Sequence, residues 1–422
     1  MSSPAHPSAA GLSGPIPTRE RIAVLDVVRG FALLGILIMN MPGFFTSFFA
    51  GGDGSLVWTG TTDRIAESVR DMLFSGKFNS MFSLLFGLGF TIQLGRMMAR
   101  DPARAPWSYV RRLLVLGVFG LIHSMVFWNG DVLHIYAVLG FAPLFLRNVT
   151  NKTVYVLLGI CLLFPLVAGL IRLVVITPGM MEKLEAEDKV WEASNNLAYG
   201  HGTFLEAARE HTREFIFDYS TPLNLWSLLG FYVQMATTTF VGFHIGRNGW
   251  VRRIPEFRPL IRKLQWRALA LGVVFAAIFG IIREFNRVPG PSLIKIVGSN
   301  AYVLCRLAMM GFYVLTIVRL AQSPDWQRRF APIAATGRMP RTNYLLQTLM
   351  ATTLFYGWGF GLFGKVGPAL GLVIAFAIYF LIQVPLSVWW LRRHEYGPME
   401  YLWRRLTYAQ PPSLQTAAAS VA

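Results

Sequence analysis

The chain has 422 residues, of which 54% are hydrophobic and 14% are charged, and its mean hydropathy is +0.46. This composition excludes an ordinary soluble domain and is typical of a polytopic membrane protein. The formal net charge of +17 would fit a nucleic-acid-binding protein, but the basic residues are concentrated in one alternating set of loops and tails. This segregation follows the positive-inside rule, so we place that set in the cytoplasm and expect no nucleic-acid partner.

Apolar windows long enough to cross a bilayer recur along the chain, and we predict about ten spans. The windows lie approximately at 24–44, 72–94, 110–128, 131–147, 153–176, 223–246, 265–283, 298–319, 341–363 and 367–391. Both terminal segments belong to the basic set, so both termini are predicted to be cytoplasmic, which requires an even number of spans. The predicted fold class is an all-α, polytopic transmembrane helix bundle.

The segments outside these windows divide the chain into parts. Residues 1–18 and 408–422 are rich in Ser, Pro and Ala and are predicted to be disordered cytoplasmic tails. The longest segment between spans, 177–222, carries charges at helical spacing and is predicted to form a helical cap on the outer face. It separates a five-helix N-terminal half at 19–176 from a five-helix C-terminal half at 223–407.

The first span carries a carboxylate, a guanidinium and an amide in an otherwise apolar stretch. Asp26 and Arg29 are three residues apart, and Arg29 and Asn40 are eleven apart, so the three side chains share one helical face. A charge at the centre of a membrane helix costs about 2.5–3.5 kcal/mol on insertion scales, so these groups need partners or a water-filled cavity. Two interpretations stay open: the side chains hold helices together, or they line a substrate site.

Lys77 and Asn79 begin another span from the outer side, within the sequence GKFNSMFSLLF. Two roles are open for them. Either both side chains extend to the membrane interface, or they bind an acceptor substrate.

His123 falls in the outer half of a predicted span, and Asn129-Gly130 predicts a turn before the next one. This turn is expected to bring Asp131 back toward His123. A carboxylate beside an imidazole fixes its tautomer and raises its basicity, which suits a general base or an acyl-accepting nucleophile. The alternative is a histidine that only bridges helices by hydrogen bonds.

Asn343 and Gln347 are four residues apart on one predicted helix near the cytoplasmic side. Arg338 and Arg341 lie at the mouth of the same segment. They are suited to bind phosphate groups, but they also obey the positive-inside rule, so their position does not separate the two roles.

Several segments of the chain resemble the YeiB-like family of bacterial membrane proteins, in the same order along the chain. They are LDVVRGFALLGILIMN at 25–40, GKFNSMFSLLFGLGF at 76–90, RRLLVLGVFGLIHSMVFWNGDVLHIYA at 111–137, GRMPRTNYLLQ at 337–347 and YGPMEYLWRRLTY at 396–408. The resemblance covers nearly the whole span region and implies a multi-pass protein of the bacterial cytoplasmic (inner) membrane. This family is similar, more distantly, to membrane acyltransferases of the heparan glucosaminide acetyltransferase type.

The distant similarity implies acyl-CoA bound from the cytoplasm, a histidine in the middle of the membrane and an acceptor on the outer face. On this basis Arg29, Arg338 and Arg341 are predicted to bind the CoA phosphates. His123 is predicted to relay or accept the proton, and Asp131 to orient it. The predicted substrate-binding residues are Asp26, Asn40, Lys77, Asn79, Asn343 and Gln347.

The leading functional hypothesis is an acyltransferase that moves an acyl group, acetyl in the simplest case, from CoA to an envelope glycan or related acceptor. A transporter or exporter is the first alternative, in which Asp26, His123 and Asp131 carry protons. A membrane scaffold without turnover is the second. His201 and His211 lack a tight ligand spacing, so we expect no metal. The expected partners are the bilayer, acyl-CoA and the acceptor, with a homodimer left open.

Overall fold

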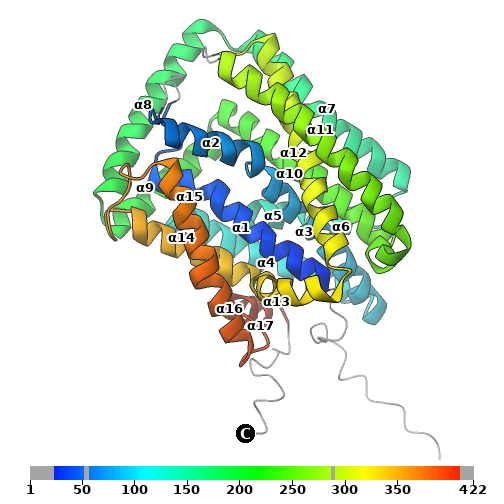
Figure 1. Cartoon of the computed structure of the whole chain (residues 1–422). Coiled ribbons are helices and arrows are strands. Elements are labelled where there is room, and N and C mark those ends of the chain that lie inside the picture. Colours follow the sequence, from blue (N-terminus) through cyan, green and yellow to red (C-terminus); the bar gives the residue numbers. More distant parts are fainter. Residues whose placement is uncertain (1–22, 52–56, 287–289, 409–422) are drawn as a thin grey trace, which may run out of the picture.

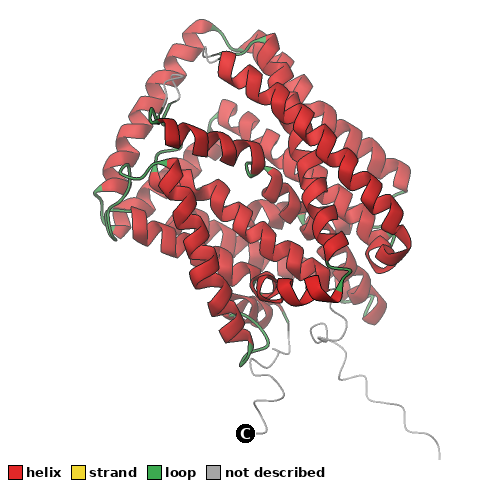
Figure 2. Cartoon of the chain, in the orientation of Figure 1, coloured by secondary structure: helices red, strands yellow, loops and turns green. Residues whose placement is uncertain are grey.

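The computed structural model describes residues 23–51, 57–286 and 290–408, and this part of the chain is helical with no strand (Figure 2). The predicted tails at 1–18 and 409–422 lie outside the described residues. Tyr408, the first residue of the predicted C-terminal tail, is described, and its hydroxyl accepts hydrogen bonds from Arg112 and from Gln93 Nε2.

The N-terminal part of the described chain contains the helices up to α7. They are α1 (Ala23–Phe45), α2 (Thr61–Leu73), α3 (Lys77–Arg100), α4 (Ala105–Ile122), a π-helical turn (His123–Phe127), α5 (Leu133–Leu139), α6 (Phe141–Phe145) and α7 (Asn151–Val175).

The remaining helices begin with the segment predicted to form the cap. They are α8 (Pro178–Gly200), α9 (Phe204–Ser220), α10 (Pro222–Arg247), a 3-10 helix (Trp250–Phe257), α11 (Arg258–Phe285), α12 (Leu293–Leu320), α13 (Pro324–Arg338), α14 (Pro340–Phe355), α15 (Pro368–Ala377), a π-helical turn (Ile378–Gln383), α16 (Val384–Leu391) and α17 (Pro398–Thr407).

Within the described residues, eight helical segments are long and apolar enough to cross a membrane. The chain is therefore an all-α, polytopic membrane protein. Two of the ten predicted windows, 131–147 and 341–363, hold shorter helices instead. In the first window, α5 begins only after Asp131 and the chain breaks at Gly140 before α6. In the second window, the glycine-rich stretch after Phe355 leaves the helix and folds back.

Helix α1 lies at the centre of the bundle and contacts α3, α13, α14 and α15 (Figure 1). Its most apolar window is 61% buried, the highest share among the candidate spans, whereas the corresponding windows around α7 and α11 are only 11% buried. Helices α8 and α9 run along the opposite flank from α7 and α11 (Figure 1). Apolar side chains exposed all round a helix are stable only in lipid, so α7 and α11 supply part of the membrane-facing surface.

Glycines allow the backbones of α3 and α10 to approach closely. A Cβ at Gly87 would overlap the carbonyl oxygen of Thr239, and a Cβ at Gly242 would overlap the carbonyl oxygen of Leu84. Small residues at such crossings are typical of membrane helices, where close packing replaces the hydrophobic effect as the main stabilising force.

Gly87→Ala is therefore expected to lower the free energy of unfolding by about 1–3 kcal/mol, because the added methyl must push the two backbones apart. Gly159→Ala on α7 is the matched control, since a Cβ there meets nothing within 4 Å. Thermal unfolding of the detergent-solubilised proteins measures both changes. Equal midpoints for the two variants would contradict the close α3–α10 contact.

Candidate functional site

His123 is placed by an irregular end of α4. The chain widens into the π-helical turn His123–Phe127, in which the N–H of Trp128 donates to the carbonyl oxygen of His123 at 2.9 Å. The indole N–H of Trp128 also donates to the carbonyl oxygen of Gly43 on α1, at 3.2 Å. A π turn changes the direction of the side chains that follow and is frequent at functional sites.

Asp131 contacts His123 after the Asn129-Gly130 turn. One carboxylate oxygen, Oδ1, lies 2.8 Å from His123 Nδ1. The other, Oδ2, accepts the backbone N–H of Leu133 at 2.8 Å and lies 3.1 Å from Nδ1 of His134. The side chains of Asp131 and His123 are 0% and 4% exposed, so the interaction is shielded from water. The expected proximity of Asp131 and His123 is present, while their chemical roles stay predictions.

The arrangement fixes how His123 carries its proton. An ionised carboxylate only accepts hydrogen bonds, so Asp131 holds the proton of neutral His123 on Nδ1 and leaves the lone pair on Nε2. His123 Nε2 is buried and has no hydrogen-bond partner among the described residues. A buried basic nitrogen with an oriented ring and a vacant lone pair is suited to accept a proton from a substrate.

His134 extends the polar contacts away from His123. Its Nε2 lies 2.7 Å from the hydroxyl of Tyr219 on α9, which in turn lies 3.1 Å from the hydroxyl of Tyr232 on α10. Sequence reasoning missed His134. The available signal was its position three residues after Asp131, at the start of the predicted next span.

A cavity of about 280 Å³, the basic cavity, lies at one end of the bundle. Six arginines line it: Arg29, Arg96, Arg112, Arg338, Arg341 and Arg404. The two carboxylates in its wall, Asp26 and Glu400, offset only part of this charge. Asp26 binds Arg29, with 2.6 Å between Oδ1 and Nη1, and Glu400 accepts backbone N–H groups at the start of α14. The cavity is therefore suited to a strongly anionic ligand.

Trp403 on α17 orders two of these arginines. The guanidinium carbons of Arg112 and Arg341 lie 3.9 and 3.8 Å from the centre of its rings. Stacking on an indole restricts a guanidinium without using its N–H donors, which stay available for hydrogen bonds to a ligand or to other residues. Arg341 Nε is buried without a hydrogen-bond partner in the described chain. Arg96, Arg112, Arg404 and Trp403 were not predicted as site residues.

A second cavity, of about 410 Å³, lies on the other side of the α5 start and is named the polar cavity. Its hydrogen-bonding side chains are Asn40, Ser75, Asn79, Asn129, Asp131, His134, Asp218, Tyr219, Gln234 and Tyr302. Val132 lines both cavities. His123 contacts residues of both walls. Its ring centre lies 5.4 Å from that of Tyr344, which lines the basic cavity, and it hydrogen-bonds Asp131, which lines the polar cavity.

Seven of the predicted site residues line these two cavities, whereas His123 lines neither of them. Asp26, Arg29, Arg338 and Arg341 line the basic cavity, and Asn40, Asn79 and Asp131 line the polar cavity.

Asn343 and Gln347 lie apart from both cavities as the described residues define them. Asn343 Nδ2 donates to Ser387 Oγ at 3.0 Å, and Gln347 Nε2 donates to Gln383 Oε1 at 2.9 Å. Both amides therefore join α14 to the helix that ends in α16.

Lys77 is buried inside the bundle. It is 1% exposed, and its Nζ donates to the carbonyl oxygen of Asp71 at 2.6 Å. The turn between α2 and α3 thus places the side chain inside the bundle, and the substrate-binding role of Lys77 stays a prediction.

Burial raises the pKa of Asp218 to about 6, although Asn129 Nδ2 donates to its carboxylate at 3.1 Å. This pKa is higher than the ordinary value of 3.8, so the folded state binds the proton more tightly than the unfolded state. The free energy of unfolding therefore falls as the pH rises from about 4 to above 6. Asp218→Asn is expected to stabilise the protein by about 1–2 kcal/mol at neutral pH and to have little effect near pH 4. Thermal unfolding of the wild-type protein and of Asp218→Asn between pH 4 and pH 7 tests this prediction. A stability difference that does not change with pH would contradict it.

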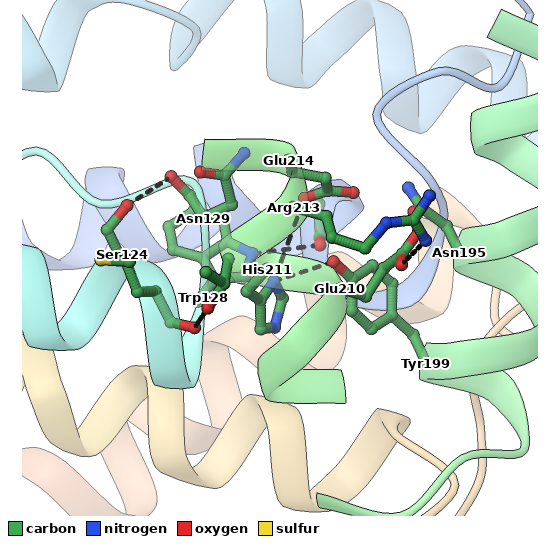
Figure 3. Close-up of polar contacts among 12 residues, drawn as sticks. Ser124, Trp128, Asn129, Asn195, Tyr199, Glu210, His211, Arg213 and Glu214 are labelled. Atoms are coloured by element: carbon green, nitrogen blue, oxygen red, sulfur yellow. Dashed lines mark hydrogen bonds and ion pairs between the residues drawn. The ribbon is translucent and has the colours of Figure 1, made fainter. Parts of the chain in front are cut away.

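His211 on α9 belongs to a separate buried cluster (Figure 3). Its Nδ1 lies 2.9 Å from the hydroxyl of Tyr199 on α8, and its Nε2 lies 3.3 Å from the hydroxyl of Tyr356. Beside it, Arg213 Nη1 donates to Glu210 Oε2 at 2.6 Å. In the part of the chain described, no group of three or more His, Cys, Asp or Glu side chains is placed to hold a metal ion. The cluster joins α8 and α9 to the C-terminal helices.

The fold and cavities define a polytopic α-helical membrane protein with a buried polar centre. Residues 245–410 match the family model described as protein of unknown function (DUF418). The chain is 30% identical to uncharacterized protein YeiB of Escherichia coli (strain K12), over 92% of this chain and 96% of that protein. It is 28% identical to uncharacterized protein YxaH of Bacillus subtilis (strain 168), over 93% and 96%. The chain belongs to this YeiB-like family.

Proposed function

We propose that the protein is a membrane acyltransferase that moves an acyl group, acetyl in the simplest case, from acyl-CoA to an envelope glycan or related acceptor. One observation carries the proposal. A cavity lined by six arginines and a cavity lined by amides, hydroxyls and carboxylates meet at Val132, and the His123–Asp131 pair lies at this wall. Two different ligands, one in each cavity, would thus lie on either side of the His123–Asp131 pair.

The basic cavity is the proposed donor site. CoA carries several phosphate charges, which guanidinium groups bind well. The positive-inside rule orients the basic end toward the cytoplasm, where acyl-CoA is made, and the protein is accordingly assigned to the bacterial inner membrane. The polar cavity then faces outward, and helix α9 of the proposed cap contributes to its lining.

The polar cavity is the proposed acceptor site. Asn79 Oδ1 is buried there without a hydrogen-bond partner among the described residues, and it can accept from a hydroxyl. In the proposed reaction the acceptor hydroxyl attacks the thioester carbonyl, the C–S bond breaks and a C–O bond forms. The hydroxyl proton moves to His123 Nε2 and from there to the CoA thiolate. Val132 and Tyr344 must move to join the two cavities.

The test uses purified protein in liposomes, with radiolabelled acetyl-CoA added on one side and bacterial envelope glycans on the other. The proposal expects label on the glycan and an equal amount of free CoA, both dependent on the protein. Passage of a labelled solute through the protein without any acyl donor, and no labelled glycan, would overturn it in favour of transport.

A further inference from the structure

Gly76 forms one end of the polar cavity and begins α3. Its φ is +72°, and the helix has no side-chain cap at this end. The first N–H groups of a helix and its dipole favour a negative charge. The N–H of Gly76 donates to Met39 Sδ at 3.2 Å and the N–H of Lys77 donates to the carbonyl oxygen of Phe74 at 3.2 Å, so the helix contributes its dipole and an anion must be bound mainly by side chains.

Lys77 places a buried ammonium group beside Gly76. Its Nζ lies 5.4 Å from the centre of the Tyr302 ring, and its hydrogen bond to the carbonyl oxygen of Asp71 uses one of its three protons. Tyr302 lines the polar cavity. The charge of Lys77 thus lies directly behind Tyr302, a residue of the cavity wall.

Arg306 on α12 adds a second buried cation at the same place. It is 1% exposed, and its Nε has no hydrogen-bond partner in the described chain. A Cβ at Gly76 would lie 2.7 Å from Arg306 Cδ and 2.5 Å from the Tyr302 hydroxyl, so Arg306 packs directly against the glycine. Side chains on a helix point toward its N-terminus, which directs Arg306 toward Tyr302.

The nearest carboxylates are already bound by other arginines. Asp71 pairs with Arg70 at 2.6 Å and with Arg283, and Glu67 lies 3.5 Å from Arg283 and 3.8 Å from Arg70. Four cations thus face two carboxylates in this region, and the excess is the pair Lys77 and Arg306. Uncompensated charge in a membrane interior is costly, so an anionic partner stabilises it.

We propose that the Gly76 end of the polar cavity recognises an anion carried by the acceptor, a carboxylate or a phosphate, through Lys77, Arg306 and the N-terminus of α3. This inference rests on the proposed function for the identity of the ligand as an acceptor. It narrows the substrate class to acidic glycans or phosphate-bearing acceptors.

The experiment measures binding of glucuronate, glucose and inorganic phosphate to the full-length protein in phosphatidylcholine nanodiscs. Glucuronate and glucose differ by a carboxylate, and glucuronate is expected to bind at least about tenfold more tightly. Arg306→Gln is expected to reduce glucuronate binding to the level of glucose, and Arg306→Lys to restore part of the difference. Arg172→Gln, an exposed arginine on α7, is the matched control and is expected to bind as wild type.

Equal binding of glucuronate and glucose by the wild-type protein would overturn the proposal, even if Arg306→Gln fails to fold. So would full discrimination by a folded Arg306→Gln. Loss of discrimination in phosphatidylglycerol nanodiscs would assign the site to a lipid phosphate instead of the acceptor. Acetyl-CoA binding is measured in the same samples: its absence from the wild-type protein, with glucuronate discrimination intact, would refute the proposed function and leave the anion site standing.

Discussion

His123→Gln is expected to lower the rate of acetyl transfer by about 100-fold or more, the usual contribution of a positioned general base. Glutamine is close to histidine in size and can still donate to Asp131, but it cannot accept a proton near neutral pH. The loss is expected in the rate and not in donor binding, because His123 is buried behind Tyr344 and not in the arginine-lined wall. The measurement is CoA release and glycan labelling by the reconstituted protein.

His201→Gln is the control for this substitution, since His201 is an exposed histidine at the end of α8. It is expected to transfer at the wild-type rate. The transfer rate of Asp131→Asn is expected to lie between the rates of His123→Gln and His201→Gln, because an amide fixes the tautomer of His123 less well than a carboxylate. Wild-type transfer by a folded His123→Gln protein that still binds acetyl-CoA would remove His123 from the mechanism.

The contact between His123 and Asp131 could be predicted because it is local. A turn at Asn129-Gly130 joins two antiparallel helices, and its residue types are sufficient to bring the two side chains together. Gly120 contributes as well, since a Cβ there would overlap the backbone at His134 and keep α5 away from α4. The sequence signal failed only at His134, which binds the second oxygen of the same carboxylate.

The partners of Asn343 and Gln347 could not be predicted, because they lie on a helix distant in the chain. The pattern of two amides on one face of α14 fits a substrate site and a helix contact equally well. The structure provides Ser387 and Gln383 as partners, so the amides pair within the bundle. The stacking of Arg112 and Arg341 on Trp403 could not be predicted for the same reason, because the three residues come from α4, α14 and α17, which are distant in the chain.

The number of spans was harder to predict than the fold class. Composition and the long apolar windows predict an all-α membrane bundle. A hydropathy window, however, does not show where a helix inside it begins late or breaks. Helix α5 begins only after Asp131 and ends at Gly140, and the glycines after Phe355 allow the chain to fold back, so two apolar windows become short helices and loops. These two interruptions lie beside the polar cavity and the His211 cluster. The polar centre of the protein depends on them.

Arg341→Gln is expected to raise the Kd for acetyl-CoA by about 10- to 100-fold, since a hydrogen bond to a charged group contributes about 1.5–3 kcal/mol. Arg341 lines the basic cavity, is held by Trp403 and has an unpartnered Nε within the described chain. A ligand phosphate can therefore bind it without breaking an ion pair. The measurement is the increase in thermal stability with acetyl-CoA concentration, because a ligand of the native state stabilises it by mass action.

Arg328→Gln makes the same charge change at an exposed position on α13 and is expected to leave the Kd unchanged. ADP is expected to bind more weakly than acetyl-CoA but to lose affinity in Arg341→Gln by a similar factor, because phosphate recognition is common to both. Higher salt is expected to weaken both ligands, since the arginines act partly through long-range attraction. Saturable binding that Arg341→Gln does not weaken would place the donor outside the basic cavity. No stabilisation of the wild-type protein at millimolar acetyl-CoA would favour transport, because the arginines would then bind a different anion.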